Sequence, residues 1–324
     1  MQCICYLYPV LNNCWLVTGG AGYIGAHVVS ELSRLGIPNI ALDNNRDKIE
    51  RRLPASNLNF CGDIRNRQDL ESVFSRNEFH GVIHLAALKS VQESQIQSDL
   101  YEETNVLGTQ NVLSLMKEHE VKNLIFSSTA AIYEENESGF VTEFSKLNPV
   151  SFYGQTKVRA ELSIEKAKLE FGLRYVNLRF FNVAGTINQR LKDDSKDNLI
   201  PIVIDCIKKG ITPKIFGGDY PTKDGTAIRD YIHISDIVQA HIASIGYLNN
   251  GGSSEAINLG TGKGTTVLEI VSEILNKTGS NLVPQFVDRR PGDSGVVVAD
   301  PSKAELILGF KAQHTLEEMI SSVL

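Results

Sequence analysis

The sequence predicts an α/β protein with a doubly wound parallel sheet of Rossmann type and a second, smaller α/β lobe. Three observations lead to this prediction. Short apolar segments alternate with segments of helical spacing through the first half, a glycine-rich turn follows the first strand-like segment, and beyond residue 181 the elements become shorter and richer in Gly and Pro. We therefore expect one unit at residues 13–181 and a second at 182–324.

Taken in order, the apolar runs place six strands of the first unit. They are expected at residues 14–18, 37–42, 57–61, 81–85, 121–127 and 173–180, and the main helices at 23–35, 95–119 and 151–171. Segments near 229–234 and 256–259 are candidates to return to the large sheet, which would interleave the two units. Ligands of such sheets bind at the carboxyl ends of the strands, so the cleft is expected there, between the lobes.

The glycine-rich turn, Gly19 to Gly25, lies between the first strand and the first helix. Its glycines allow a tight turn, close approach of a pyrophosphate and packing of helix on strand, and the helix amino end favours an anion. Asp43 ends the second strand, where a carboxylate accepts hydrogen bonds from a ribose and repels a 2′-phosphate. This favours NAD over NADP, although Arg46 and Lys48 nearby could pair with a phosphate.

Tyr153 and Lys157 stand four residues apart in the 151–171 helix and so share one face. A free phenol has a pKa of about 10. A cation about 4 Å away, at an effective dielectric of about 20, is worth roughly 4 kcal/mol. The pair therefore predicts that, if both groups are sheltered from water, the lysine brings the pKa of the tyrosine near neutrality, as a general base requires. A surface helix with an unrelated pair is the alternative.

Composition limits the kind of partner. The net charge is −6 and no basic patch or long apolar run is present, which excludes nucleic acid and membrane partners. The first dozen residues lack the features of a signal peptide, and five scattered cysteines fit a reducing cytoplasm. The seven histidines form no ligand cluster, so no metal is expected.

Other polar residues occur at the expected strand ends. A hydroxyl in Phe126–Thr129 could bridge substrate and Tyr153, whereas His84 is interpreted as a satisfied core residue. Arg229 and Arg290 suit bidentate binding of a diphosphate, with a surface ion pair as the default alternative for each.

Together these residues resemble those of the UDP-glucose 4-epimerases, which are extended short-chain dehydrogenases/reductases. The resemblance runs from about Cys14 to the C-terminus. It rests on GGAGYIGAH (19–27), LDN (42–44), GDIRN (62–66), HLAALKSV (84–91), NVLGT (105–109), FSSTAAIY (126–133), FYGQTK (152–157), LRFFNVAG (178–185), NLIP (198–201), IFGGDYPTKDGTAIRDYIH (215–233), NLGTG (258–262) and RRPGD (289–293).

The resemblance implies roles for individual residues. Tyr153 is the expected base, Lys157 its cation and ribose anchor, and Thr129 the bridging hydroxyl. The residues expected to hold NAD are Gly19, Gly22, Tyr23, Ile24, Gly25, Asp43, Asn44, Asp63, Ile64 and Lys89, with Tyr153 and Lys157. Those expected to hold the UDP-sugar are Thr129, Asn182, Asn198, Leu199, Phe216, Arg229, Arg290, Asp293 and Val297.

The implied reaction is the interconversion of UDP-galactose and UDP-glucose. Tyr153 would take the C4 hydroxyl proton while NAD accepts the C4 hydride, and the keto sugar would turn over and take the hydride back. A homodimer is expected through the 95–119 and 151–171 helices, with Val106, Leu113 and Leu162 as seam candidates. For Val106, Leu113 and Leu162 the alternative is that they face their own sheet.

The chain departs from the family pattern near the expected base. Thr129 stands where the family mostly has Ser, Glu134 replaces a usual Gly, and Phe152 replaces a common Pro. Val297 occupies a position where some members carry a Tyr that excludes N-acetylated sugars, so this chain is expected to accept them; a plain strand residue is the alternative.

Three other functions remain open at this point. An epimerase of another UDP-sugar, an N-acetylhexosamine or a glucuronate, fits the same residues. A nucleotide-sugar 4,6-dehydratase would need an Asp-Glu pair where Ala130 and Ala131 stand. A non-catalytic NAD-binding regulator would be expected to have lost Tyr153 or Lys157.

Overall fold

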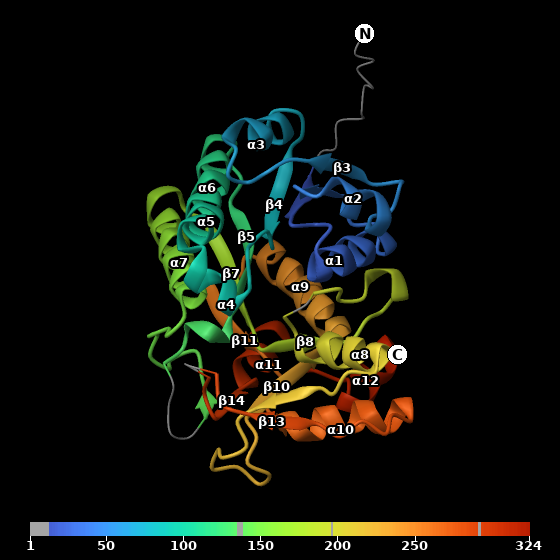
Figure 1. Cartoon of the computed structure of the whole chain (residues 1–324). Helices are drawn as coiled ribbons and strands as arrows, with labels where there is room; N and C mark the ends of the chain where they lie inside the picture. The colour runs from blue at the N-terminus through green and yellow to red at the C-terminus, as the bar shows by residue number, and fades with distance from the viewer. Residues whose placement is uncertain (1–12, 135–138, 196, 291–292) are drawn as a thin grey trace.

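The computed structural model describes residues 13–134, 139–195, 197–290 and 293–324 (Figure 1). Its largest element is a seven-stranded, entirely parallel sheet in the order β11-β7-β5-β4-β1-β2-β3. The strands are β1 (Cys14–Thr18), β2 (Asn39–Asp43), β3 (Leu58–Cys61), β4 (Phe79–His84), β5 (Asn123–Thr129), β7 (Arg174–Phe180) and β11 (Glu255–Leu259). The predicted doubly wound Rossmann-type sheet is confirmed.

Helices cover both faces of this sheet. In Figure 1, α3, α6 and α7 lie on one side and α1 and α9 on the other. The helices around the sheet are α1 (Tyr23–Arg34), α2 (Arg46–Arg52), α3 (Arg67–Phe74), α4 (Val91–Ile96), α5 (Ser98–Tyr101), α6 (Gly108–Glu118), α7 (Phe152–Phe171), α9 (Ile234–Asn249) and α11 (Ser302–Leu308).

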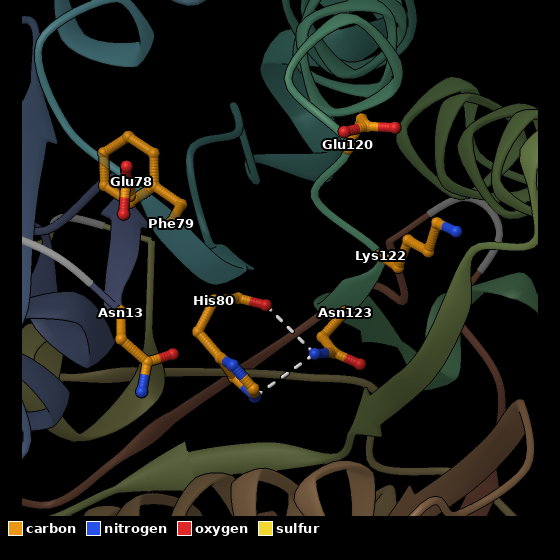
Figure 2. Close-up of a pocket in the computed structure, with 7 residues that line it drawn as sticks. All are labelled: Asn13, Glu78, Phe79, His80, Glu120, Lys122 and Asn123. Carbon is orange, nitrogen blue, oxygen red and sulfur yellow. Dashed lines mark hydrogen bonds between the residues drawn. The ribbon is translucent and has the colours of Figure 1, made fainter.

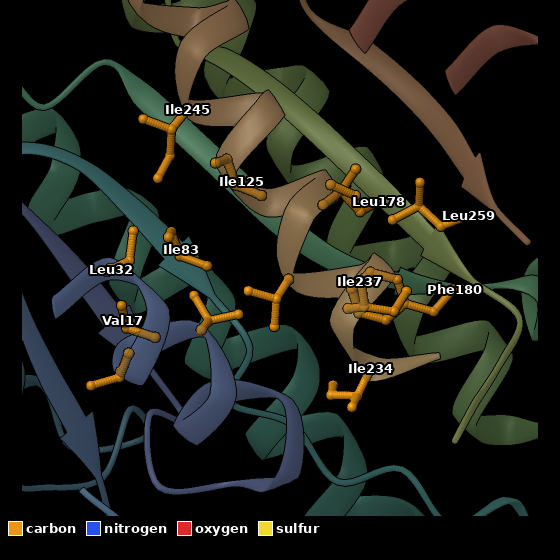
Figure 3. Packing of buried hydrophobic residues seen from close by; sticks show 14 of the residues in the cluster. Val17, Leu32, Ile83, Ile125, Leu178, Phe180, Ile234, Ile237, Ile245 and Leu259 are labelled. Atoms are coloured by element: carbon orange, nitrogen blue, oxygen red, sulfur yellow. The ribbon is translucent and has the colours of Figure 1, made fainter. Parts of the chain in front are cut away.

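Each face has its own apolar core. On one face, Ile234, Ile237 and Ile245 of α9 pack with strand residues such as Val17 and Leu178 (Figure 3). On the other face, side chains of α3, α6 and α7 pack against the same strands. Because both faces are covered, β1 is buried along its whole length, which explains its unbroken apolar sequence.

The single helix expected at 95–119 is wrong in detail. The helical segment starts earlier, at Val91, where the Ser90 side chain accepts a hydrogen bond from the backbone N–H of Glu93. It is interrupted at Gln97, whose backbone is not helical, and continues as α5, a π-helical stretch (Glu102–Leu107) and α6. Within the π-helical stretch the buried Asn105 amide binds both the N–H and the carbonyl of Leu88, a tertiary contact that periodicity does not reveal.

The proposed dimer seam is only partly available. Val106 and Leu113 are buried within the chain, and Leu113 packs in the apolar core on the α6 side of the sheet, so the alternative that it faces its own sheet is confirmed for Leu113. Leu162 of α7 is 64% exposed and Leu107 is 48% exposed.

The second lobe holds two small sheets. One has the order β12-β10-β14-β6, with β8 also paired to β10, and the other pairs β13 with β9. The strands are β6 (Phe140–Val141), β8 (Asn182–Ala184), β9 (Lys214–Phe216), β10 (Ile228–His233), β12 (Gly264–Thr266), β13 (Gln285–Val287) and β14 (Val296–Ala299). The helices are α8 (Leu199–Lys209), α10 (Val267–Thr278) and α12 (Leu316–Val323), with 3₁₀ turns at Ala130–Ile132 and Gln189–Leu191.

The two lobes exchange strands. The segment at 256–259 lies in β11 and extends the large sheet beside β7. The segment at 229–234 does not return there: its strand, β10, pairs with β8, β12 and β14 in the second lobe. In the opposite direction, β6 comes from the first half of the chain and pairs with β14.

Candidate active site

The glycine turn forms a tight cradle at the carboxyl end of β1. Gly19 has a φ of +68°, and a Cβ there would lie 2.6 Å from the backbone N of Ala86. A Cβ on Gly25 would lie 2.1 Å from the Gly19 carbonyl oxygen. Gly22 is the N-cap of α1 and supplies no side-chain cap, so the amino end of the helix keeps N–H groups for an anion. The turn therefore fits a dinucleotide pyrophosphate.

Asp43 is tied to this turn. One carboxylate oxygen accepts a hydrogen bond from the N–H of Ala21 at 3.0 Å and the other from the N–H of Asn45 at 3.0 Å. The carboxylate is thus fixed at the end of β2, beside the turn, where it would meet an adenosine ribose. A fixed negative charge there fits NAD and disfavours a 2′-phosphate.

The other residues expected at the cofactor lie around the same strand ends. Asn44 donates to the Asp63 carboxylate at 3.3 Å, and the Arg65 guanidinium lowers the pKa of Asp63. The Tyr23 hydroxyl donates to the Gly185 carbonyl at 2.6 Å, which links α1 to the second lobe. Of the remainder, Ile24 packs against the core, Ile64 is buried and Lys89 is exposed between β4 and α4.

Tyr153, Lys157 and Thr129 converge at the carboxyl end of β5. Tyr153 lies in the first turn of α7, and its backbone N–H donates to the Ser94 hydroxyl at 3.1 Å. Its phenol interacts with the side chain of Thr129, the last residue of β5, and this interaction lowers the pKa of Tyr153. Lys157 Nζ donates to the Ser127 carbonyl at 2.8 Å and lies 4.7 Å from the centre of the Phe126 ring.

Burial governs the charges of this pair. Burial raises the pKa of Tyr153 to about 12, with the Thr129 hydrogen bond acting in the opposite direction. Burial also lowers the pKa of Lys157 to about 7, opposed by the Glu161 carboxylate. The prediction that Lys157 brings the pKa of Tyr153 near neutrality is therefore wrong for this structure, because removing both groups from water favours their neutral forms.

His84 is the satisfied core residue that the sequence indicated. Its ring nitrogens contact the Thr18 hydroxyl at 2.6 Å and the Thr109 hydroxyl at 3.0 Å. Burial lowers the pKa of His84 to about 3, so the ring stays neutral.

The residues expected at the UDP-sugar lie in the second lobe. Arg229 of β10 is in register with Val297 of β14, and two residues later Tyr231 pairs with Asn182 of β8. Arg290 stacks on the Phe216 ring at 3.9 Å, and its Nε is buried without a hydrogen-bond partner among the described residues. Neither Arg229 nor Arg290 forms a salt bridge in the described part of the chain, contrary to the ion-pair alternative.

The other three substrate candidates are Asp293, Asn198 and Leu199. The Asp293 N–H donates to the Arg290 carbonyl at 3.2 Å. Asn198 donates to the Asp193 carboxylate at 2.5 Å, and Leu199 begins α8.

The departures from the family pattern have local partners. The exposed Glu134 carboxylate accepts hydrogen bonds from Lys146 at 2.9 Å and Asn148 at 2.8 Å. The Phe152 ring lies 5.2 Å from the Arg159 guanidinium.

A buried polar cluster behind Lys157 was not predicted from the sequence. Glu161 of α7 and Arg179 of β7 form a salt bridge at 2.6 Å, and Ser128 donates to Glu161 at 2.5 Å. Its signal was present in the sequence: Arg179 interrupts an apolar strand, where a charge requires a partner.

A hollow outside this site lies at the opposite end of the large sheet, and Figure 2 shows the residues that line it. It measures about 330 Å³ and is lined by Asn13, Glu78, Phe79, His80, Glu120, Lys122 and Asn123, at the amino ends of β4 and β5. It contains none of the expected site residues. A second hollow, of about 250 Å³, is lined by Asp63, Arg65, Asn66 and Glu103.

None of the helices in the described part of the chain is long and apolar enough to cross a membrane. Nor do the His, Cys, Asp and Glu side chains in the same ranges gather into a group that could hold a metal ion.

Known proteins resemble this chain in both sequence and structure. The model of the NAD dependent epimerase/dehydratase family matches residues 15–260. A UDP-glucose 4-epimerase from Halalkalibacterium halodurans is 40% identical over 311 residues, covering 94% of this chain and 92% of the relative. A crystal structure of a UDP-glucose 4-epimerase superposes with a TM-score of 0.91 at 36% identity, covering 96% of each chain. The Bifidobacterium longum UDP-glucose 4-epimerase in complex with NAD⁺ and UDP superposes with a TM-score of 0.89 at 34% identity, covering 96% of this chain and 97% of that one.

Proposed function

The chain belongs to the NAD-dependent epimerase/dehydratase family, and on that premise we propose that it is an isomerase that interconverts UDP-galactose and UDP-glucose with NAD as its cofactor. The observation that carries the proposal is the meeting of Tyr153, Lys157 and Thr129 at the carboxyl end of β5. The glycine turn follows β1 at the same end of the large sheet. The names of relatives that cover nearly the whole chain support the same substrate pair.

Tyr153 is proposed to move the proton of the C4 hydroxyl. The phenol is buried and in contact with the Thr129 hydroxyl, so Thr129 can hand the proton between sugar and phenol or hold the sugar oxygen in place. Lys157, one helical turn away on the same face, supplies a cation when it is protonated, and that cation favours the phenolate. NAD, when bound, supplies a reversible acceptor for the C4 hydride.

The cofactor is proposed to lie along the carboxyl ends of β1 to β3. The Gly19–Gly25 turn and the amino end of α1 would take the pyrophosphate, and Asp43 the adenosine ribose. We therefore propose residues 13–181 as the NAD-binding unit and 182–324 as the UDP-sugar unit, with β6 and β11 exchanged between them.

The substrate diphosphate is proposed to lie against Arg229 and Arg290. Both guanidinium groups are without a carboxylate partner in the described residues, and the buried Nε of Arg290 has an unused donor. A diphosphate would satisfy such donors in bidentate fashion. Firm binding of the nucleotide with few charges near the sugar suits a ring that must present both faces.

A second substrate pair is favoured by one residue. Val297 lies beside Arg229 and packs with Tyr133 and Phe181, so its short side chain leaves room that a Tyr would fill. We propose that UDP-N-acetylglucosamine and UDP-N-acetylgalactosamine are also interconverted. A glucuronate epimerase has no such observation in its favour, and Ala130 and Ala131 speak against a dehydratase.

The assembly is proposed to be a homodimer in the cytoplasm. Leu162 and Leu107 expose apolar surface on neighbouring helical segments that already contact each other through Arg159 and Glu102. The free thiols of Cys61 and Cys206, among the described residues, are consistent with a reducing compartment.

The decisive experiment is incubation of the purified protein with UDP-galactose and no added cofactor. Formation of UDP-glucose without net oxidation, together with NAD released on denaturation, is the expected result. An apo protein activated equally by NADP would contradict the assignment of Asp43. Loss of water from the sugar would identify a dehydratase, and no turnover at all a binding protein.

A further inference from the structure

A buried ion pair joins the helix of the proposed base to the neighbouring strand. The Arg179 guanidinium donates to both carboxylate oxygens of Glu161, at 2.6 and 3.1 Å. The two side chains are only 6% and 8% exposed. Ser128 donates to the same carboxylate at 2.5 Å, so Glu161 is held by three donors from β5 and β7. Such an arrangement has little freedom to shift.

The cluster continues across the large sheet. Ser128, Arg179 and Asn258 are in register on β5, β7 and β11 and form one polar row. Arg179 also donates to the Tyr133 hydroxyl at 2.9 Å, and that hydroxyl donates to the Asn258 side chain at 2.6 Å. The row therefore reaches from α7 to the far edge strand with its hydrogen bonds paired.

The position of this row relative to the site is specific. Ser128 immediately precedes Thr129, and Glu161 follows Lys157 by one helical turn and Tyr153 by two. Residues at such spacing share a helix face. The polar row therefore holds α7 by the face that carries the proposed base, next to the strand end that carries its hydroxyl partner.

Building on the proposed function, we propose that Glu161, Arg179 and Ser128 act as positioning residues for the reaction. They fix the depth and rotation of α7 against β5, which keeps Tyr153 and Lys157 in place relative to Thr129, and Glu161 keeps a negative charge one turn from Lys157. None of the three needs to touch the substrate. Buried ion pairs add little net stability, whereas a fixed geometry is what a proton transfer requires.

The charges around Lys157 indicate what the loss of Glu161 would do. Tyr153 and Glu161 face Lys157 from α7, and His84 faces it from β4. Arg179 of β7 lies behind Glu161. The strand β5 contributes the Phe126 ring and the Ser127 carbonyl, which carry no charge. His84 is neutral above its pKa of about 3. The Glu161 carboxylate raises the pKa of Lys157 against burial, so without it Lys157 should lose its proton at lower pH.

The test compares Glu161→Gln and Ser128→Ala with Tyr175→Phe. Tyr175 of β7 donates a hydrogen bond to Glu165 of α7, which lies one helical turn farther from Tyr153 than Glu161 does. Its replacement therefore removes a similar hydrogen bond between β7 and α7, but at a place farther from the proposed base. We expect kcat with UDP-galactose to fall by about 10- to 100-fold in Glu161→Gln and less in Ser128→Ala. KM should change little, and the alkaline fall of kcat should move to lower pH in Glu161→Gln. Tyr175→Phe should keep the wild-type kcat and pH profile.

A readout without turnover separates this proposal from the proposed function. Lys157→Met is placed in the wild-type and Glu161→Gln backgrounds, and thermal unfolding of the four proteins is measured near pH 7. The two substitutions should be coupled, with Lys157→Met raising the unfolding temperature more in the Glu161→Gln background. This measurement holds even if UDP-galactose is not the substrate.

Three results would overturn the proposal: equal loss of kcat in Tyr175→Phe and Glu161→Gln, an unchanged pH profile in Glu161→Gln, or strictly additive unfolding temperatures. If Glu161→Gln does not fold, Ser128→Ala decides. It removes one of the three donors and leaves the ion pair in place, and a wild-type kcat in that variant would contradict a positioning role.

Discussion

The Tyr153 hydroxyl is one of several buried phenols, and its chemistry depends on its neighbours. Tyr231 of β10 is also fully buried, with a pKa raised to about 12 by desolvation, yet it stands outside the meeting point of Thr129 and Lys157. Tyr153 and Tyr231 are thus buried to a similar extent but have different neighbours: only Tyr153 lies beside Thr129 and Lys157.

Tyr153→Phe should fold and bind UDP-sugar but lose most of its activity. General acid–base catalysis contributes about 10²- to 10⁴-fold, and kcat should fall within that range. Tyr231→Phe is the matched control and should remain active. Steady-state kinetics together with UDP binding measured by calorimetry checks both, and near wild-type turnover of Tyr153→Phe would show that another group is the base.

Lys157 should make stability depend on pH. Its pKa is about 7 in the folded chain against an ordinary value of 10.5, so between these values the unfolded chain binds more protons and stability rises with pH. Below about pH 7 the folded chain carries the full cost of the buried ammonium. Lys157→Met should therefore raise the unfolding temperature most below pH 7, with the gain shrinking toward pH 10.

The control for this measurement is Lys209→Met. Lys209 is an exposed lysine whose pKa is raised by Asp205, so it stays charged in both states over that range. Its effect should not vary between pH 6 and 9. A Lys157→Met effect equally independent of pH would mean that Lys157 is not desolvated in solution.

Val297 should set the range of sugars. Val297→Tyr should abolish turnover of UDP-N-acetylgalactosamine and keep that of UDP-galactose, because the larger ring occupies the space beside Arg229. Product analysis with both substrates measures the ratio. If the wild-type chain turns over only the unacetylated pair, the volume at Val297 is not what decides.

At the scale of single elements, the first turn of α7 packs closely against the 3₁₀ turn at Ala130–Ile132. A Cβ on Gly154, next to the proposed base, would lie 2.3 Å from the Ala131 carbonyl oxygen. The α7 N-cap, Ser151, accepts a hydrogen bond from the Gly154 N–H at 3.0 Å, so the first turn is held on two sides. The helix α7 and the 3₁₀ turn at Ala130–Ile132 therefore cannot move apart from each other without breaking other contacts.

Gly154→Ala should therefore lower both stability and kcat, since the methyl group forces α7 away from Ala131. Gly246→Ala is the contrasting substitution, because Gly246 lies within α9 with no atom near the added Cβ. It should stabilise the chain by about 0.5–1 kcal/mol and leave kcat unchanged. Denaturant unfolding and initial rates test the pair, and an equal response of the two variants would argue against close packing at Gly154.

The sequence predicted these elements unevenly, for physical reasons. The β1 strand, the glycine turn and α7 depend on local patterns of apolar residues, glycines and caps, and such patterns are visible in a single chain. The break at Gln97 and the π-helical stretch depend on Asn105 reaching Leu88, a contact across the fold. The pKa of Tyr153 was misjudged because burial of the phenol, which raises that pKa, cannot be read from a four-residue spacing.

For the candidate site as a whole, the motifs indicated which side chains lie close together but not which residues support them. Tyr153, Thr129 and Lys157 meet as expected, and Asp43 reaches the glycine turn. Glu161 and Arg179 were missed, because pairing partners far apart in sequence follow from the register of strands. The prediction that the 229–234 segment joins the large sheet was also wrong, since an apolar sequence predicts a strand but not the sheet to which the strand belongs.

At the scale of the whole molecule, assembly should depend on exposed leucines of α7. Leu162→Glu should give a monomer at micromolar concentration, because a charge would be buried at the proposed seam. Leu306→Glu places the same charge on α11, where the leucine is 82% exposed, and should leave the mass unchanged. Light scattering distinguishes them, and a wild-type chain that is already monomeric would contradict the dimer.

The exchange of strands between the lobes also constrains the order in which the chain can fold during its synthesis. The outer edge of β7 has no neighbour until β11 has been synthesised, about 80 residues later in the chain, after β8 to β10. A nascent chain that has already made Tyr153 and Lys157 still lacks Asn258, the last member of the polar row. Until then it presents an open strand edge, a surface that chaperones and other nascent chains can bind. Completion of the polar row that holds α7 is therefore tied to translation of the second lobe, and a message cut short after β7 would yield a fragment prone to aggregation rather than a smaller folded protein.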